Sequence, residues 1–197
     1  MLQTAKKKLI IDRALAGRIL AQKRADSKKV YSVHAPEVEC IAKGKARKKY
    51  EFGVKVSVAT TSREGIVIGM RSLPGNPYDG HTLSGSIEQA QRIIARELDG
   101  DVFVDRGYKG HDYCGAATVH IVGRIKRKIK NAMSRWEKRR AAVEPEIGHL
   151  KNDGRLGRNY LLGSLGDMLN AMLCGSGHNI RKLLAYLSQR PALTARA

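Results

Sequence analysis

Asp105 is the first residue whose type and position could do chemistry. It closes a short apolar segment, 101–105, that reads as a buried strand. Ligands of α/β sheets bind at the carboxyl ends of strands, and charged side chains are rarely buried without a partner. An aspartate at such a place is also a common cap of a turn. Taken alone, Asp105 is therefore either a catalytic carboxylate or a turn cap.

A second set of ionisable residues follows on a predicted helix. Glu144 and Lys151 come four and eleven residues after Arg140, which places the three within roughly 40° of one another on an unbroken helix. Such a row is either an ion-pair stripe worth roughly tenths of a kcal/mol or a metal-binding carboxylate beside cations that hold phosphates. Pro145 disfavours helix at the preceding residue and predicts a kink or a new helix start there.

The net charge favours a polyanion as the partner. The 197 residues include 37 Lys+Arg and 18 Asp+Glu, for a formal charge of +19. Such an excess repels itself, and nucleic acid is the commonest compensating partner, with a membrane surface second. Because aromatic residues make up only 5%, salt-sensitive phosphate contacts are favoured over base stacking. Basic residues concentrate at 1–29, 43–49 and 124–140.

Together, a strand-end Asp105 and a helical Glu144 in a basic protein fit phosphoryl transfer on DNA. In that chemistry, two Mg²⁺ ions held by carboxylates activate the nucleophile and stabilise the leaving oxygen. Mg²⁺ (or Mn²⁺) takes oxygen ligands, whereas the three cysteines are dispersed and predict neither a zinc site nor a disulfide framework. No uncharged stretch reaches the ~18 residues needed to cross a bilayer, and no secretion signal is recognised, so a reducing cytoplasm is expected.

The elements that must position these residues follow from hydrophobic periodicity. Helices are predicted over 5–24, 83–98, 126–141, 144–151 and 164–188. Strands over 50–60 and 66–70 are expected to form a hairpin, with two more strands at 101–105 and 118–122. This order predicts an α/β protein, a mixed sheet with helices packed on it. The long apolar helix 164–188 is expected to cover the core, and part of it could face a partner subunit.

Several stretches resemble one family, the DDE transposases of bacterial insertion sequences, in the group named for insertion sequence five. The matching segments are YSVHAPEVEC at 31–40, YEFGVKVS at 50–57, LPGNPYDGHTL at 73–83, VDRGYKGH at 104–111, VEPEIGHLK at 143–151 and GRNYL at 157–161. The resemblance spans about 30–190. It implies an RNase H-like fold and Mg²⁺-dependent cleavage and joining of double-stranded DNA at transposon ends, in a bacterial, nucleoid-associated protein.

The resemblance also implies roles for individual residues. Asp105 corresponds to the family's second catalytic aspartate and Glu144 to its catalytic glutamate, so this pair would hold the metal. Arg140 and Lys151 match the arginine and lysine around that glutamate. The residues expected to contact DNA phosphates are Arg140, Lys151, Arg106, Lys126, Arg127 and Lys128. Asp79, His81, Tyr108 and His149 lie inside matching motifs, but no catalytic role is expected for them.

The sequence departs from the family at its beginning. The family's first catalytic aspartate lies on a first strand, well upstream of the segment equivalent to Tyr31, and only 30 residues precede Tyr31 here. Asp12 mimics a strand-end aspartate, but the helical period of 5–24 runs through it. We therefore expect a basic helical segment (1–30), a catalytic-domain fragment lacking the first strand (31–190) and a tail (191–197).

Three functions remain open from the sequence. A truncated transposase should bind DNA but be catalytically impaired, because two carboxylates rarely hold both metals. A non-catalytic DNA-binding fragment could inhibit or modulate the intact enzyme, as a homo-oligomer or in hetero-oligomers with it. A basic RNA-binding or ribosome-associated protein is the third. A missing central strand would leave open sheet edges, which predicts association and poor solubility.

Overall fold

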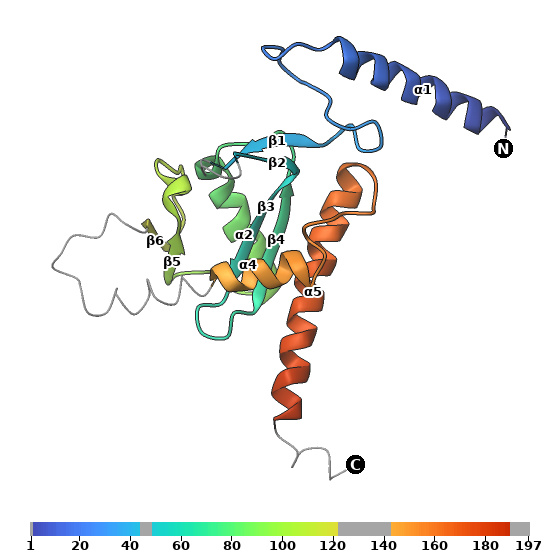
Figure 1. Ribbon diagram of the computed structural model, residues 1–197. Helices are drawn as coiled ribbons and strands as arrows, with labels where there is room; N and C mark the ends of the chain where they lie inside the picture. Colours follow the sequence, from blue (N-terminus) through green and yellow to red (C-terminus); the bar gives the residue numbers. More distant parts are fainter. Residues whose placement is uncertain (1, 44–48, 122–142, 190–197) are drawn as a thin grey trace.

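The computed structural model describes residues 2–43, 49–121 and 143–189. Within these ranges the chain is a mixed α/β protein, as the periodicity predicts (Figure 1). The predicted helix over 126–141 lies outside the described residues.

The centre of the molecule is an antiparallel hairpin of β3 (Lys55–Thr60) and β4 (Val67–Leu73), which confirms the predicted hairpin. The Thr61 amide donates to the Ile66 carbonyl at 2.8 Å and closes the turn. Helices cover both faces of the hairpin. Ser57 contacts Ser86 of α2 (Leu83–Ile94) at 3.0 Å, whereas its strand neighbours Val56 and Val58 pack against the opposite helical layer, because successive side chains of a strand point to opposite faces.

The core consists of two apolar clusters. One joins the hairpin to α4 (Val143–Asn152) and α5 (Gly163–Ser188). Its buried members are Val67, Met70, Leu150, Ala171 and Cys174. The other joins α2 to β5 (Asp101–Val104) through Leu83, Ile87 and Val104. The element that carries Asp105 and the element that carries Glu144 are therefore fixed by different clusters.

Helix α5 lies close to β4 because small residues face the strand. A Cβ added at Gly175 would lie 2.7 Å from Met70 Cγ. One turn further, the Asn179 side-chain amide accepts from the Val67 amide and donates to the Val67 carbonyl, both at 2.8 Å. This two-way hydrogen bond fixes the register of α5 along the hairpin, and α5 confirms the predicted helix over 164–188.

The single strand predicted over 50–60 is wrong. The segment divides at Gly53, whose φ of 151° suits glycine alone. Residues before it form β2 (Tyr50–Gly53), paired with β1 (Glu39–Ala42), and residues after it form β3. Phe52 of β2 is 62% exposed, and its ring lies 5.2 Å from the Tyr31 ring between centroids.

Two predicted helices have different ends in the structure. The helix predicted over 83–98 ends at Ile94, because Ala95 takes a left-handed conformation (φ 53°) and its amide caps the Gln91 carbonyl. The N-terminal helix, predicted over 5–24, is α1 (Leu2–Ala21). Asp12 lies inside α1 and not at the end of a strand, which confirms the helical interpretation.

The strands do not form one sheet. The described residues form three two-stranded sheets, β1–β2, β3–β4 and β5–β6, where β6 (Thr118–Ile121) is parallel to β5. In the described part of the chain, β3 pairs only with β4 and β5 only with β6. Backbone groups on one edge of each strand are thus left without a strand partner.

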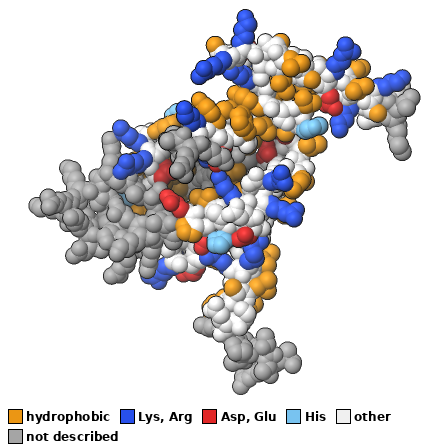
Figure 2. All heavy atoms as spheres, viewed as in Figure 1, with side chains coloured by type: hydrophobic (Ala, Val, Ile, Leu, Met, Phe, Trp, Pro, Cys, Tyr) orange, Lys and Arg blue, Asp and Glu red, His pale blue; other side chains and the backbone are white. Residues whose placement is uncertain are grey.

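Much apolar surface is exposed on α1 and α5. Figure 2 shows hydrophobic side chains on both helices, among the basic side chains of α1. Leu20 of α1 is 86% exposed, and Leu165, Leu173 and Leu184 of α5 are 63%, 65% and 59% exposed. None of the described helices is both apolar and long enough to span a bilayer.

Candidate active site

A cleft of about 2400 Å³ runs between the hairpin, α2, β5 and α4. Residues of β3 and of β5 line it, so the open edges of these two strands border the same space. Asp105, Glu144 and Lys151 also line it. The structure thus brings to one cleft the two carboxylates that the sequence singled out, together with one of the predicted phosphate-binding lysines.

Asp105 both caps a turn and borders the cleft. It directly follows β5, and its Oδ1 accepts a 2.8 Å hydrogen bond from the Gly107 amide, at the start of the short helix η2 (Arg106–Tyr108). The turn-capping interpretation is therefore correct. It is compatible with a role in the cleft, because the side chain is exposed and a carboxylate accepting one hydrogen bond keeps lone pairs for a cation.

Glu144 and Lys151 lie on α4 and line the cleft together, as their spacing on a helix predicts. Pro145 is the third residue of α4 as the structure describes it. The Glu144 side chain is exposed. Its position on a helix packed by the fully buried Leu150 fixes the backbone from which it projects.

Lys151 is held by a glutamate far away in the sequence. Glu51 of β2 lies 2.7 Å from Lys43 Nζ and 3.4 Å from Lys151 Nζ. The hydrogen bond from Lys43, then the charges of Lys151 and Lys43, outweigh partial burial and lower the pKa of Glu51 to about 2. Glu51 is thus ionised at neutral pH and competes with a phosphate for Lys151.

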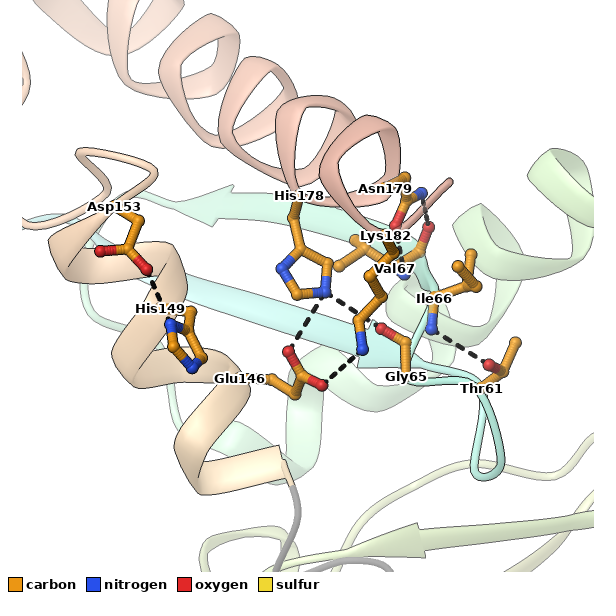
Figure 3. Close-up of polar contacts among 10 residues, drawn as sticks. All are labelled: Thr61, Gly65, Ile66, Val67, Glu146, His149, Asp153, His178, Asn179 and Lys182. Carbon is orange, nitrogen blue, oxygen red and sulfur yellow. Dashed lines mark hydrogen bonds and ion pairs between the residues drawn. The ribbon is translucent and has the colours of Figure 1, made fainter. Parts of the chain in front are cut away.

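A second glutamate of α4 fixes this helix to the rest of the molecule. Glu146 points towards α5, where Lys182 Nζ lies 2.7 Å from its Oε1 and His178 Nε2 lies 3.3 Å from its Oε2 (Figure 3). His178 Nε2 is also 3.2 Å from the Gly65 carbonyl. Both neighbours of Nε2 are acceptors, so this nitrogen carries a proton. Glu146, which also lines the cleft, therefore orients α4, and with it Glu144, through its contacts with α5.

The remaining predicted phosphate contacts are distributed differently. Arg106 on η2 is exposed and lies outside the residues that line the cleft. Arg140, Lys126, Arg127 and Lys128 lie outside the described residues. In the described ranges, no group of three or more His, Cys, Asp or Glu side chains is close enough to hold a metal ion. Asp105 and Glu144 carry carboxylate oxygens, the ligand type that Mg²⁺ prefers, and the described part of the chain forms no cluster of three such side chains around them.

The comparison with protein families shows the family of this chain. A family model described as the transposase DDE domain matches residues 24–174. The chain belongs to this family. No curated protein and no solved structure matches it. DDE transposase domains use divalent metal ions, and the match covers Asp105, Glu144 and Lys151, the residues that line the cleft of this transposase domain.

Sequence reasoning missed three contacts that surround the candidate site of this transposase domain. Glu51 pairs with Lys151, Glu146 joins α4 to α5, and Asp79 lies beside Gly107 of η2. Glu51, Asp79 and Glu146 all lie in segments that resemble the family, at 50–57, 73–83 and 143–151, and this is the signal that the sequence offered. Nothing in the sequence relates Glu51 to Lys151, because their pairing depends on how β2 and α4 pack.

Proposed function

We propose that this transposase domain binds double-stranded DNA at the ends of an insertion sequence of the group named for insertion sequence five. At these ends it takes part in the cleavage and joining of DNA strands by Mg²⁺-dependent phosphoryl transfer. One observation carries the proposal. Asp105 and Glu144, which come from different elements and different core clusters, line the same cleft as Lys151.

Each residue has a distinct role in this proposal. Asp105 and Glu144 hold the divalent cation, which when bound polarises the phosphodiester and stabilises the leaving oxygen. Lys151 contacts a DNA phosphate after leaving Glu51. Arg106 on η2 extends the basic surface that contacts DNA phosphates. The same role is proposed for Arg140, Lys126, Arg127 and Lys128. The charge of +19 supports a salt-sensitive grip on DNA.

The chain by itself is proposed to be catalytically impaired, because no strand of the described residues joins β3 to β5 into one RNase H-like sheet. Two facts support this. The edges of β3 and β5 border one cleft without a strand partner among the described residues, and the described residues provide no cluster of three metal ligands. A strand carrying a further aspartate, paired with both edges, would join the two sheets and complete the metal site.

The test is strand cleavage of labelled duplexes carrying the terminal repeats of the element, with Mg²⁺ or Mn²⁺. The chain alone should bind the duplex and show little or no turnover. Adding a separate polypeptide that supplies a strand with a further aspartate should restore cleavage, and Asp105→Asn or Glu144→Gln should abolish it. Robust turnover by the chain alone would contradict the impairment. Restored cleavage that survives both substitutions would contradict the assignment of the carboxylates.

A second candidate function is a non-catalytic DNA-binding fragment that modulates the intact transposase. The observation that favours it is the same absence of a three-ligand cluster in the described ranges, combined with the high positive charge. Such a fragment should inhibit the intact enzyme in mixing experiments. Its inhibition should persist in the Asp105→Asn variant, because it depends on occupying DNA or on mixed oligomers.

A further inference from the structure

Asp79 and Asp105 both lie close to Gly107, although they belong to different elements. Asp79 begins the short helix η1 (Asp79–Thr82), and Asp105 precedes η2. A Cβ added at Gly107 would lie 2.4 Å from Asp79 Oδ2 and 3.0 Å from Asp105 Oδ1. Because both distances start from the same point, Asp79 Oδ2 and Asp105 Oδ1 are separated by no more than the sum of the two distances. This is within the roughly 6 Å over which neighbouring charges act strongly on each other.

Lys55 of β3 keeps the Asp79 carboxylate in this place. Its Nζ donates to Asp79 Oδ1 at 3.0 Å and to the Pro77 carbonyl at 2.7 Å. The Lys55 and Asp79 side chains are only 22% and 33% exposed, so water screens the pair less than it screens a pair on an open surface. All three residues around this contact, Lys55, Asp79 and Asp105, line the cleft.

The segments that carry the two aspartates are also packed against each other. The Tyr78 hydroxyl donates to the Lys109 carbonyl, and a Cβ added at Gly80 would lie 3.3 Å from His111 Cα. With η1 held to η2 in this way, Asp79 cannot retreat from Asp105 without breaking its contact with Lys55. The charge beside Asp105 is thus set by the ion pair between Lys55 and Asp79.

We propose that Asp79 is a positioning residue for the divalent cation at Asp105. Its charge, held beside Gly107 by Lys55, attracts the cation, and Lys55 limits that attraction. This inference rests on the proposed function, in which Asp105 is a metal ligand. The pair is nearly neutral as a unit. Removing one partner exposes the charge of the other to a cation bound at Asp105.

The experiment measures Mn²⁺ affinity of the full chain by titration calorimetry, with electron paramagnetic resonance of free Mn²⁺ as a second readout. Asp79→Asn keeps the shape of the side chain and leaves Lys55 uncompensated, so Mn²⁺ should bind roughly tenfold more weakly. Lys55→Met leaves Asp79 uncompensated, so Mn²⁺ should bind more tightly by a similar factor. If the ion pair had only a structural role, both substitutions would change the Mn²⁺ affinity in the same direction, because both break the same contact.

The control is Asp153→Asn, which breaks an exposed pair with His149 on α4 and should leave Mn²⁺ affinity within about twofold of the parent. Thermal unfolding verifies that each variant folds, and Lys55→Gln replaces Lys55→Met if the latter does not. Equal or same-direction shifts in the Asp79 and Lys55 variants, with binding still lost in Asp105→Asn, overturn this inference alone. Mn²⁺ binding that is absent, or unaffected by Asp105→Asn, overturns it together with the proposed role of Asp105.

Discussion

Glu146 of α4 and His178 of α5 meet across the interface between their helices, with 3.3 Å between Oε2 and Nε2. The His178 side chain is only 5% exposed, and Lys182 occupies the other carboxylate oxygen of Glu146. The Glu146 carboxylate thus pairs with both the Lys182 ammonium and the His178 ring nitrogen, and it fixes the helix that carries Glu144. The catalytic geometry proposed for the cleft depends on this contact, although Glu146 would not touch the metal.

Glu146→Gln should destabilise the fold by about 1–3 kcal/mol, because it leaves Lys182 without its counter-charge and weakens the contact with buried His178. Chemical unfolding monitored by circular dichroism measures this. Asp153→Asn on the same helix is the matched control. Its partner His149 is 65% exposed, so its cost should be below about 0.5 kcal/mol. Equal costs for the two variants would contradict the structural role of Glu146.

Leu150→Ala should be among the most destabilising single truncations. Leu150 is 0% exposed and packs between α4, α5 and the hairpin, so its removal leaves a cavity. Truncations of this kind cost about 2–5 kcal/mol. Leu173→Ala is the comparison, because its side chain is 65% exposed and little apolar area returns to water. A cost below about 1 kcal/mol for Leu150→Ala would place this leucine outside the core.

Two helical glycines should respond in opposite directions to alanine. At Gly175 the added methyl would lie 2.7 Å from Met70 Cγ and 3.1 Å from Val67 Cγ1, and such overpacking costs about 1–3 kcal/mol. At Gly148 on α4 it would meet no heavy atom within 4 Å, and replacing a helical glycine there should stabilise by about 0.5–1 kcal/mol. Melting temperatures of the two variants check this. Stabilisation by Gly175→Ala would exclude the close approach of α5 to β4.

The contribution of Glu51 to stability should disappear in acid. Its pKa in the folded protein is about 2, against an ordinary value of 4.5. A lowered folded-state pKa gives stability that is fully present above the unfolded-state pKa and is lost as the pH falls towards 2. The stability difference between the parent chain and Glu51→Gln should therefore be largest above about pH 5 and shrink between pH 4.5 and 2. A difference independent of pH would contradict the ion pairs with Lys43 and Lys151.

Association of the chain in solution follows from its open edges and exposed apolar helices. Among the described residues, β3 and β5 each have one edge without a strand partner, and Leu183, Leu184 and Leu187 are exposed on the last turns of α5. We expect sizing chromatography with light scattering to show oligomers or aggregates. Leu183→Glu and Leu187→Glu together should reduce association through α5, whereas association through the strand edges would persist. A monodisperse monomer would contradict this expectation.

The sequence alone determined the local elements and the residues that could do chemistry. The alternation of apolar and polar residues in strands and the three- to four-residue spacing of apolar residues in helices are local properties. The hairpin, α4, α5 and the strand before Asp105 could therefore be predicted. The helical spacing of Glu144 and Lys151 likewise sufficed to place them on one face. The break at Gly53 and the end of α2 at Ala95 could not be predicted, because they depend on backbone conformations with positive φ that the residue types permit but do not require.

Only the tertiary structure decided which residues meet. Glu51 reaches Lys151, Asp79 reaches Gly107, and Glu146 joins His178 through packing between elements distant in the chain. The strands were expected in one sheet, yet β3 and β5 remain in separate sheets around a cleft. Strand pairing is a non-local interaction, so a hydrophobic pattern can specify a strand without specifying its neighbour. For this reason the residues and elements of the candidate site could be predicted from the sequence, whereas their arrangement in space could not.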